Sequence, residues 1–219
     1  MIVGLIRQEQ FEVLDCTGRR TGERIGRDDA HRTGIWHGAF HCLITYPRVG
    51  KQHALFQLRS SAKKIAASRF DVSVGGHYAG GETVRDAAPR EISEELGIEI
   101  AFTHLVSLGK RVSVYCFEPG IRELEFQDVF LLPMEGRPTG LSLQESEVDG
   151  LLEVDVEKGL SLFSGILPEI TGNFTAPDGS SAPKTVRASD FVPSLDNYYC
   201  KLLILARRYA AGERNGLAI

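Results

Sequence analysis

The sequence predicts an α/β (α+β) fold in which a mixed sheet is covered by helices. Short segments with the apolar and polar alternation of β-strands recur along the chain and are separated by turn residues. One helical pattern follows the first group of strands, and a second helical pattern lies near the end of the chain. With 219 residues, 42% of them hydrophobic, the chain can bury a core, so we expect one domain, residues 1–219.

The first half of the chain is expected to form a hairpin and three further strands. Residues 11–25 alternate around Thr17 and Gly18, which predicts two short strands joined by a turn. This hairpin belongs to an N-terminal extension, residues 1–30. The further strands are expected at residues 39–46, 53–58 and 70–74.

The second half of the chain is expected to contain strands, two helices and a loop. The strands are expected at residues 103–117, 123–132 and 148–154, and the helices at residues 155–163 and 194–209. Asp155 and Ser194 are the expected N-caps, and the last helix lies within a C-terminal unit, residues 190–212. Residues 173–184 are rich in Pro, Gly and Ser, which predicts a surface loop.

Composition and charge limit the kinds of partner that the protein can bind and the cellular compartment that we expect for it. The net charge of −4 provides no basic surface for bulk nucleic acid, whereas a small charged nucleotide is compatible with it. No apolar run is long enough to span a membrane, and residues 1–6 are too short for a signal peptide, so we expect a cytoplasmic protein. A homodimer is left open. The four cysteines lack C-x-x-C spacing and are expected to be reduced, mostly buried thiols: Cys16, Cys42, Cys116 and Cys200.

Residues 76–98 contain the strongest chemical signal in the chain. On a helix, Glu91, Glu94 and Glu95 lie at positions i, i+3 and i+4, so their side chains share one face. Three carboxylates this close repel one another unless hard divalent cations lie among them. Mg²⁺ and Mn²⁺ suit such oxygen ligands and commonly bridge to substrate phosphates.

This segment, GHYAGGETVRDAAPREISEELGI, resembles the Nudix box, G-x5-E-x7-R-E-U-x-E-E-x-G-U with U apolar. Every fixed position matches: Gly76, Glu82, Arg90, Glu91, Ile92, Glu94, Glu95, Gly97 and Ile98. A solvated acidic helix is the alternative, but it does not explain why Gly76, Glu82 and Arg90 stand in register. The resemblance implies an α/β/α sandwich and a metal-dependent hydrolase of a diphosphate linkage in a nucleoside diphosphate derivative or related organic pyrophosphate.

The resemblance also implies roles for the residues of the box. Glu91, Glu94 and Glu95 would bind Mg²⁺ or Mn²⁺, with the Gly76 carbonyl adding an oxygen. Glu82 and Arg90 would form an ion pair that holds the loop and the helix. The general base would be Glu94 or, from a later strand, Glu125.

The helix of the box has local signals of its own. Thr83 is an expected N-cap, Asp86 favours the first turn, and Gly97 can terminate the helix. Pro89 removes one backbone hydrogen bond, so we expect a regular helix only from Pro89 onward.

The flanks of the box resemble one branch of the superfamily, the group around isopentenyl diphosphate isomerase. That isomerase binds a metal through three histidines and two glutamates, and the corresponding positions here are His31, His37, His77, Glu123 and Glu125. We expect His31 to lie in a loop. If the five side chains converge, with the imidazoles about 4 to 5 Å apart, they form a second site for Zn²⁺ or Mn²⁺. Ordinary hydrogen-bonded histidines are the alternative.

Two differences between this sequence and the isomerase favour hydrolysis over isomerisation. The catalytic cysteine of the isomerase falls on Gly75 here, so the protonating thiol is absent, and this box is complete where that of the isomerase is degenerate. An isomerase-like enzyme and a non-catalytic nucleotide-binding module are the alternatives.

Two further groups are candidates for contact with substrate or water. Arg59 and Lys63 are positioned to meet phosphate oxygens, although surface solvation explains them equally well. Glu145 or Glu147 could supply the loop glutamate that orients water in many Nudix enzymes, against the alternative of a solvated acidic loop.

Overall fold

A nine-stranded mixed sheet forms the centre of the structure, a computed structural model that describes residues 9–219. The main path of the sheet runs β11 (Ser181–Val186), β10 (Ile170–Thr175), β9 (Val148–Asp155), β4 (Lys51–Arg59), β3 (Trp36–Arg48), β8 (Glu123–Pro133) and β7 (Val106–Tyr115). β3 and β8 run parallel, and the other neighbours on this path are antiparallel. Residues 1–8, the start of the expected extension, lie outside the described residues.

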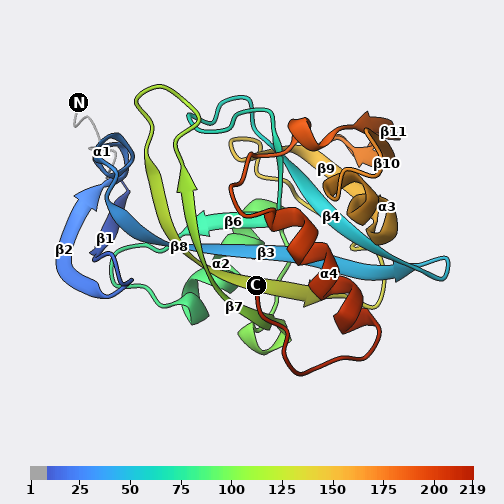
Figure 1. The fold of residues 1–219 in the computed structure, drawn as a ribbon, viewed down its shortest axis with the longest axis horizontal. Coiled ribbons are helices and arrows are strands. Elements are labelled where there is room, and N and C mark those ends of the chain that lie inside the picture. The colour runs from blue at the N-terminus through green and yellow to red at the C-terminus, as the bar shows by residue number, and fades with distance from the viewer. Residues whose placement is uncertain (1–8) are drawn as a thin grey trace.

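Helices cover both faces of this sheet, which confirms the predicted sandwich. In Figure 1, α4 (Tyr198–Ala210) crosses in front of the sheet and α2 (Val84–Leu96) lies behind it. The helix α3 (Val156–Phe163) packs beside α4. Alternation along β3 separates the two cores, because Cys42 packs toward α2 and Leu43 toward α3 and α4.

The predicted N-terminal hairpin is present, and a short helix follows it. β1 (Gln10–Leu14) and β2 (Arg20–Gly26) form a separate two-stranded sheet. The helix α1 (Arg27–Thr33) was not expected, because it has seven residues and no apolar periodicity, and it ends where Gly34 adopts a φ of 73°. His31 therefore lies on a helix, and the expectation of a loop at this position is wrong.

The helix α2 ends at the expected glycine, but the residue at its N-cap does not make the expected capping hydrogen bond. Gly97, with a φ of 70°, terminates the helix. Thr83 occupies the N-cap position, but its hydroxyl donates to the Asp86 carboxylate at 2.6 Å and accepts no backbone N–H.

The expectation that α2 is regular only from Pro89 onward is wrong. The helix is continuous from Val84 with Pro89 inside it. Backbone N–H groups of Asp86 and Ala87 donate to the Thr83 carbonyl, so the first turn is closed. Packing of the buried Ala87 against the body adds support that local propensity does not include.

The expected strand at residues 70–74 is divided into two. β5 (Phe70–Asp71) pairs with β4, and β6 (Val74–His77) pairs with β3. Between them, the Ser73 hydroxyl accepts from the Ile44 N–H at 2.7 Å and donates to the Leu55 carbonyl. Ser73 therefore bridges β3 and β4 at the point where the two strands separate.

The expected loop at residues 173–184 is instead most of the β10–β11 hairpin. Thr175 pairs with Ser181 across a turn in which Gly179 has a φ of 83°. Pro183 is accommodated because β11 is an edge strand. The Pro-Asp-Gly sequence of this segment is itself a turn signal between two strands.

The expected N-cap of α3 is used, whereas that of α4 is wrong: α4 begins at Tyr198, four residues after the expected start, and its N-cap is Asn197. The Asp155 carboxylate accepts from the backbone N–H groups of Glu157 at 2.9 Å and Lys158 at 3.2 Å. The Ser194 hydroxyl accepts from the Tyr198 N–H at 3.2 Å. Ser194 therefore contacts the first residue of α4 without being its N-cap, and the Asn197 side chain makes no capping hydrogen bond.

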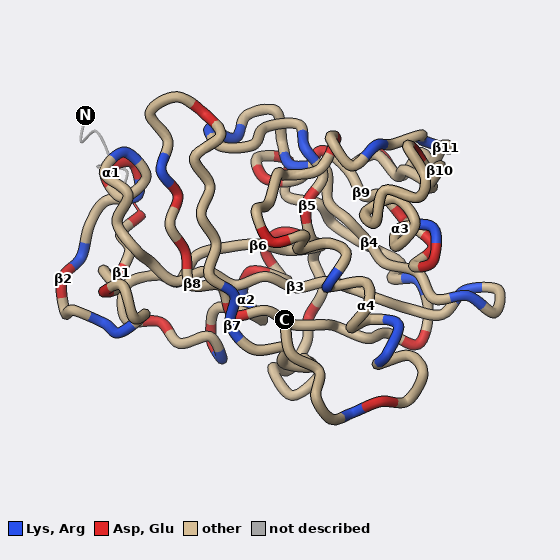
Figure 2. The backbone as a smooth tube through the Cα atoms, viewed as in Figure 1, with Lys and Arg blue, Asp and Glu red and all other residues tan. Residues whose placement is uncertain are grey.

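All four cysteines are free, but the expectation that most are buried is wrong. Cys42 is buried and Cys200 is half-buried, whereas Cys16 and Cys116 are exposed. Within residues 9–219, no helix has the length and apolarity needed to cross a membrane. Figure 2 shows that acidic and basic positions are interspersed along the chain.

We expect Leu202→Ala to lower the free energy of unfolding by about 2–5 kcal/mol, because Leu202 is fully buried between α4 and the sheet. Ile204→Ala is the matched control on the same helix, since this side chain is 37% exposed. Denaturant unfolding of both variants measures the difference. Equal destabilisation by the two substitutions would contradict the packing described for α4.

Candidate functional site

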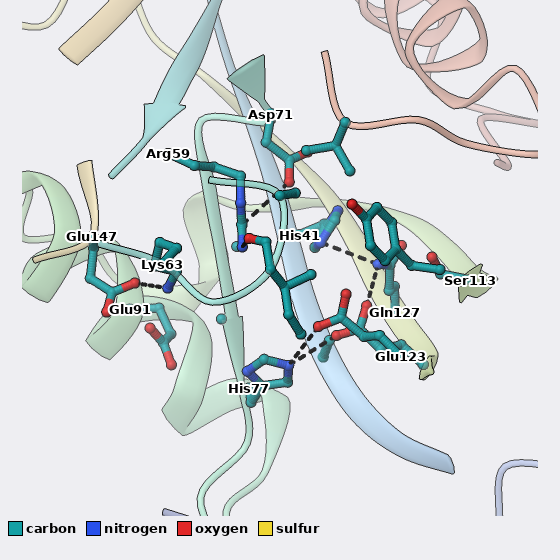
Figure 3. Close-up of a pocket in the computed structure, with 18 of the residues that line it drawn as sticks. His41, Arg59, Lys63, Asp71, His77, Glu91, Ser113, Glu123, Gln127 and Glu147 are labelled. Atoms are coloured by element: carbon teal, nitrogen blue, oxygen red, sulfur yellow. Dashed lines mark hydrogen bonds and ion pairs between the residues drawn. The ribbon is translucent and has the colours of Figure 1, made fainter. Parts of the chain in front are cut away.

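A polar cavity of about 200 Å³ opens where β3 leaves β4 and pairs with β6. Figure 3 shows side chains from several elements directed into this cavity. The α2 glutamates line one part of it, and His77, Glu123 and Glu125 line another. The two groups of metal-ligand candidates therefore share one cavity.

Arg90 ties α2 to the loop that precedes it. Its guanidinium donates to both carboxylate oxygens of Glu82 at 2.8 Å and to the His77 carbonyl at 3.3 Å. These hydrogen bonds lower the pKa of Glu82. The ion pair between Glu82 and Arg90 is the one expected from the sequence, and its geometry is bidentate.

Glu95 is buried and Glu91 is partly buried beside the cavity. The Glu91 carboxyl group packs so closely on Gly76 that a Cβ atom at position 76 would overlap it. Burial, opposed by Arg90, raises the pKa of Glu91 to about 7. Burial and the Glu91 charge raise the pKa of Glu95 well above its ordinary value, and Gln57 donates to Glu95 at 3.3 Å. These carboxylates are costly as anions without a nearby cation.

Glu94 is half-exposed at the mouth of the cavity. The Arg90 Nη1 atom lies 2.9 Å from a Glu94 oxygen and 3.0 Å from a Glu91 oxygen. Among residues 9–219, the clusters whose ligand atoms lie within 4.8 Å of one another all contain histidine. The structure therefore places Glu91, Glu94 and Glu95 in one cavity without bringing their oxygens to a common point.

The three histidines and two glutamates expected at a second site converge. The ligand atoms of His31, His37 and His77 lie within 4.8 Å of one another, as do those of His77, Glu123 and Glu125. The His77 Nε2 atom is 2.9 Å from Glu125 and 4.0 Å from Glu123 (Figure 3). The His31 Nε2 atom is 3.7 Å from Glu123, and the His37 Nε2 atom is 3.7 Å from Glu125. This arrangement meets the distance expected from the sequence.

The donor set of this cluster fits a metal ion. The His37 Nδ1 atom lies 2.9 Å from the Ile35 carbonyl, which can only accept, so Nδ1 carries the proton and Nε2 has the free lone pair. Within the described residues, the Nε2 atoms of His31 and His37 are buried without a hydrogen-bond partner. The lone pair of His37, which faces the Glu125 carboxylate at 3.7 Å, repels that carboxylate unless a cation lies between them.

Electrostatics in the cluster favour neutral imidazoles at His31 and His77 and an ionised carboxylate at Glu125. Burial and the neighbouring imidazoles lower the pKa of His31 to about 3, and burial lowers the pKa of His77 to about 4. Burial and the charge of Glu125 raise the pKa of Glu123 to about 8. Burial also opposes the charge of Glu125, but the hydrogen bond with His77 outweighs it and lowers the pKa of Glu125. Neutral imidazole is the form that binds metals.

Phe11, which the sequence did not single out, covers the histidine cluster. This residue of β1 is 1% exposed, and its ring stacks on His37 and His77 with centroid distances of 4.5 Å. The N-terminal hairpin therefore separates the cluster from solvent on this side. No sequence signal connected Phe11 with histidines that follow it by 26 and 66 residues.

Arg59 and Lys63, the expected phosphate contacts, both line the cavity. An Arg59 nitrogen lies 3.6 Å from Asp71, and Lys63 forms an ion pair with Glu147. Within residues 9–219, the Arg59 Nε atom is buried without a hydrogen-bond partner. Glu147 therefore lies at the cavity wall, whereas Glu145 is exposed and does not line it.

A hydrogen-bonded network of polar side chains, absent from the sequence expectations, lines the rest of the cavity. Arg111 donates to both carboxylate oxygens of Asp196, at 2.8 and 3.0 Å, and to the Gln127 carbonyl oxygen at 2.6 Å. Gln127 in turn contacts Glu125 and His41. One signal could have found Gln127, because it lies two residues beyond Glu125 on the same strand and shares its facing.

Comparison with known proteins agrees with this geometry. The chain is 29% identical over 201 residues to an uncharacterized Nudix hydrolase of Clostridium acetobutylicum, covering 89% of this chain and 95% of that protein. It is 27% identical over 133 residues to an isopentenyl-diphosphate Delta-isomerase of Serratia proteamaculans, covering 60% of this chain and 70% of the isomerase. This second match is consistent with the branch suggested by the flanks of the box.

A crystal structure of a Deinococcus radiodurans protein shares the fold. It superposes with a TM-score of 0.55 at 21% identity, covering 72% of this chain and 90% of that one. The NUDIX domain model matches residues 36–163, which include the box and the strands from β3 to β9 but not β10, β11 or α4. The chain therefore belongs to the Nudix family.

Proposed function

We propose that this Nudix hydrolase cleaves the diphosphate linkage of a nucleoside diphosphate derivative or a related organic pyrophosphate, with Mg²⁺ or Mn²⁺. The observation that supports it most is the shared cavity. Acidic metal-ligand candidates on α2 and the cationic residues Arg59 and Lys63 face the same space. Such a space accommodates a diphosphate between its metal ions and its basic wall. The expected partner is thus a small molecule.

The α2 glutamates and the Gly76 carbonyl are the proposed ligands for Mg²⁺ or Mn²⁺. Bound divalent ions would neutralise the diphosphate and activate a water. Their charge would also compensate the buried Glu91 and Glu95, which have no other source of full charge balance at neutral pH. The Glu94 side chain would leave Arg90 and turn into the cavity, a movement that its exposure permits.

The remaining roles follow from position. Glu125 is held by His77 and Gln127, so we assign it to the histidine cluster and assign the general base to Glu94. Arg59, with an unpartnered Nε atom within residues 9–219, and Lys63 would contact phosphate oxygens. The histidine cluster is the proposed second site, for Zn²⁺ or Mn²⁺. A single domain and a cytoplasmic location stay predictions from the sequence, and a homodimer stays open.

An isomerase-like activity is the alternative that the second relative raises. Gly75 occupies the position expected for the catalytic cysteine, and a Cβ atom there would lie 3.4 Å from the His41 ring. A Cβ atom would therefore fit at this position, but the thiol of the isomerase is absent. A non-catalytic nucleotide-binding module is the other alternative, and it has no use for buried carboxylates that only a metal would stabilise.

A substrate panel distinguishes these three functions. We expect phosphate or nucleotide release from at least one of ADP-ribose, UDP-glucose and the nucleoside triphosphates in Mg²⁺ or Mn²⁺. Isopentenyl diphosphate should give no dimethylallyl diphosphate. Tight binding without release across the whole panel would instead support the binding module, and formation of dimethylallyl diphosphate would support the isomerase.

We expect Glu94→Gln and Glu95→Gln each to lower kcat by about 10²–10⁴-fold on the substrate found in the panel. The amide removes the negative charge at nearly constant shape, so the melting temperature should change little. Glu145→Gln is the matched control, because Glu145 is exposed outside the cavity. Wild-type turnover by either variant would refute the role of that glutamate.

Gly76→Ala tests the close contact between the metal loop and α2. The added methyl group would overlap the Glu91 carboxyl group and displace it from the cavity. We expect kcat/KM to fall by at least about tenfold, the weaker end of what a displaced group near the metal costs. Gly136→Ala should leave kcat/KM unchanged, because within residues 9–219 no atom beyond the two neighbouring positions lies within 4 Å of the added Cβ. Steady-state kinetics of both variants decides the point.

His37→Gln tests the second metal site without relying on turnover. We expect the wild type to retain Zn²⁺ or Mn²⁺ after desalting and His37→Gln to bind it at least about 10–100-fold more weakly, the loss that even outer partners of a ligand cause. Metal analysis and a metal-dependent shift in melting temperature provide the readout. His104→Gln, an exposed histidine, is the control. Equal retention by both variants would refute the site.

A further inference from the structure

The polar network of the cavity fixes the direction of each of its hydrogen bonds. It runs from Arg111 on β7 through Gln127 on β8 and His41 on β3 to Tyr198, the first residue of α4. All four side chains line the cavity. Figure 3 shows the contacts of Gln127 with its neighbours at the end of the cavity near His41.

The Gln127 amide is oriented by partners on both sides. Arg111 Nη1, which can only donate, lies 2.6 Å from Oε1, so that atom is the carbonyl oxygen. The Glu125 carboxylate, which accepts, lies 2.6 Å from the amide nitrogen. A flipped amide would set donor against donor and acceptor against acceptor.

This orientation determines the tautomer of His41. The Gln127 amide nitrogen is a donor and lies 3.2 Å from His41 Nε2, so Nε2 must be the accepting, unprotonated nitrogen. Burial lowers the pKa of His41, and the ring is therefore neutral. Its single N–H proton is then on Nδ1, which lies 3.1 Å from the Tyr198 hydroxyl oxygen.

The Tyr198 hydroxyl consequently accepts from His41 and retains its own proton for another acceptor. Burial keeps this hydroxyl protonated, since it raises the pKa of Tyr198 well above its ordinary value. Within residues 9–219, His41 is its only hydrogen-bond partner. The Arg111 guanidinium lies 3.9 Å above the Tyr198 ring and fixes its plane. The neighbouring Tyr199 differs, because its hydroxyl is 2.9 Å from Asp71 and already has an acceptor.

We propose that Tyr198 is a specificity-determining residue that donates a hydrogen bond to an oxygen or nitrogen on the organic group of the diphosphate substrate. This inference rests on the proposed function and names the class of that group: a polar sugar or nucleoside. A hydrocarbon chain would leave the Tyr198 hydroxyl unpaired in a buried site, which is unfavourable. Ser113 and Asp71 make the surrounding wall polar as well.

The first test reads the tautomer and requires no substrate. Long-range ¹⁵N–¹H correlation spectra of the wild type, with the ring signals assigned by their loss in His41→Asn, should show a neutral His41 protonated on Nδ1. Protonation on Nε2 would overturn the direction of the network and with it the donor role of Tyr198. This outcome is independent of whether the protein hydrolyses anything.

The second test measures binding with Tyr198→Phe, which removes only the hydroxyl. Calorimetry is performed in the presence of Mg²⁺ with ADP-ribose, UDP-glucose, isopentenyl diphosphate and inorganic tripolyphosphate, and every protein compared also carries Glu94→Gln so that the compounds are not cleaved during the titration. We expect the variant to bind the better of the two sugar nucleotides about 3–10-fold more weakly, the range of one neutral hydrogen bond. Its affinity for isopentenyl diphosphate and tripolyphosphate should be unchanged.

Tyr209→Phe on the same helix, outside the cavity lining, is the control and should bind all four compounds as the wild type does. Unchanged sugar-nucleotide affinity in Tyr198→Phe, or equal weakening of tripolyphosphate, would overturn the role of Tyr198 while the proposed function stands. Failure of the wild type to bind any of the four compounds would refute the proposed function and the substrate class together.

Discussion

The cavity depends on one change of partner by strand β3. From residue 44 onward β3 pairs with β4, whereas residues 39–42 pair with β6, so β3 and β4 separate in the middle of the sheet. Separation would leave backbone polar groups unpaired, but the Ser73 hydroxyl binds one from each strand. The gap is therefore a stable part of the fold. Because β6 leads directly into the loop before α2, the same fork places the box at the cavity.

Acidic and basic side chains line this cavity together. Glutamates from α2 and β8 face it together with Arg59, Lys63 and Arg111. Two of these basic residues already form ion pairs with other carboxylates, Lys63 with Glu147 and Arg111 with Asp196. The carboxylates of Glu91, Glu95 and Glu123 are left with raised pKa values, which means that protein cations alone do not balance them. Divalent metal ions would supply the missing charge.

Local patterns in the sequence were sufficient for the box and for most strands, because their residues are close together in the chain. The histidine cluster could also be predicted from the sequence, because the family resemblance placed His31 and Glu123 in one ligand set. The network through Gln127, His41 and Tyr198 was not, because its partners are 86 and 157 residues apart. No periodicity reports such a contact. The β10–β11 hairpin does have a local signal, its Pro-Asp-Gly turn. Its Pro, Gly and Ser content is also typical of a loop, and this similarity explains why the sequence predicted a loop there.

The two proposed metal sites differ in how they meet solvent. The histidine cluster lies beneath the buried ring of Phe11, so an ion there would be shielded from solvent on that side. The α2 glutamates open to the cavity mouth through the half-exposed Glu94, where Mg²⁺ could keep waters and arrive with a phosphate. On the proposed function, the first ion belongs to the protein and the second accompanies the substrate.

The hairpin that carries Phe11 lies outside the main sheet, so the fold itself does not require it. Its stacking contacts with His37 and His77 instead connect it to the site, which explains why a separate two-stranded sheet is held at this edge.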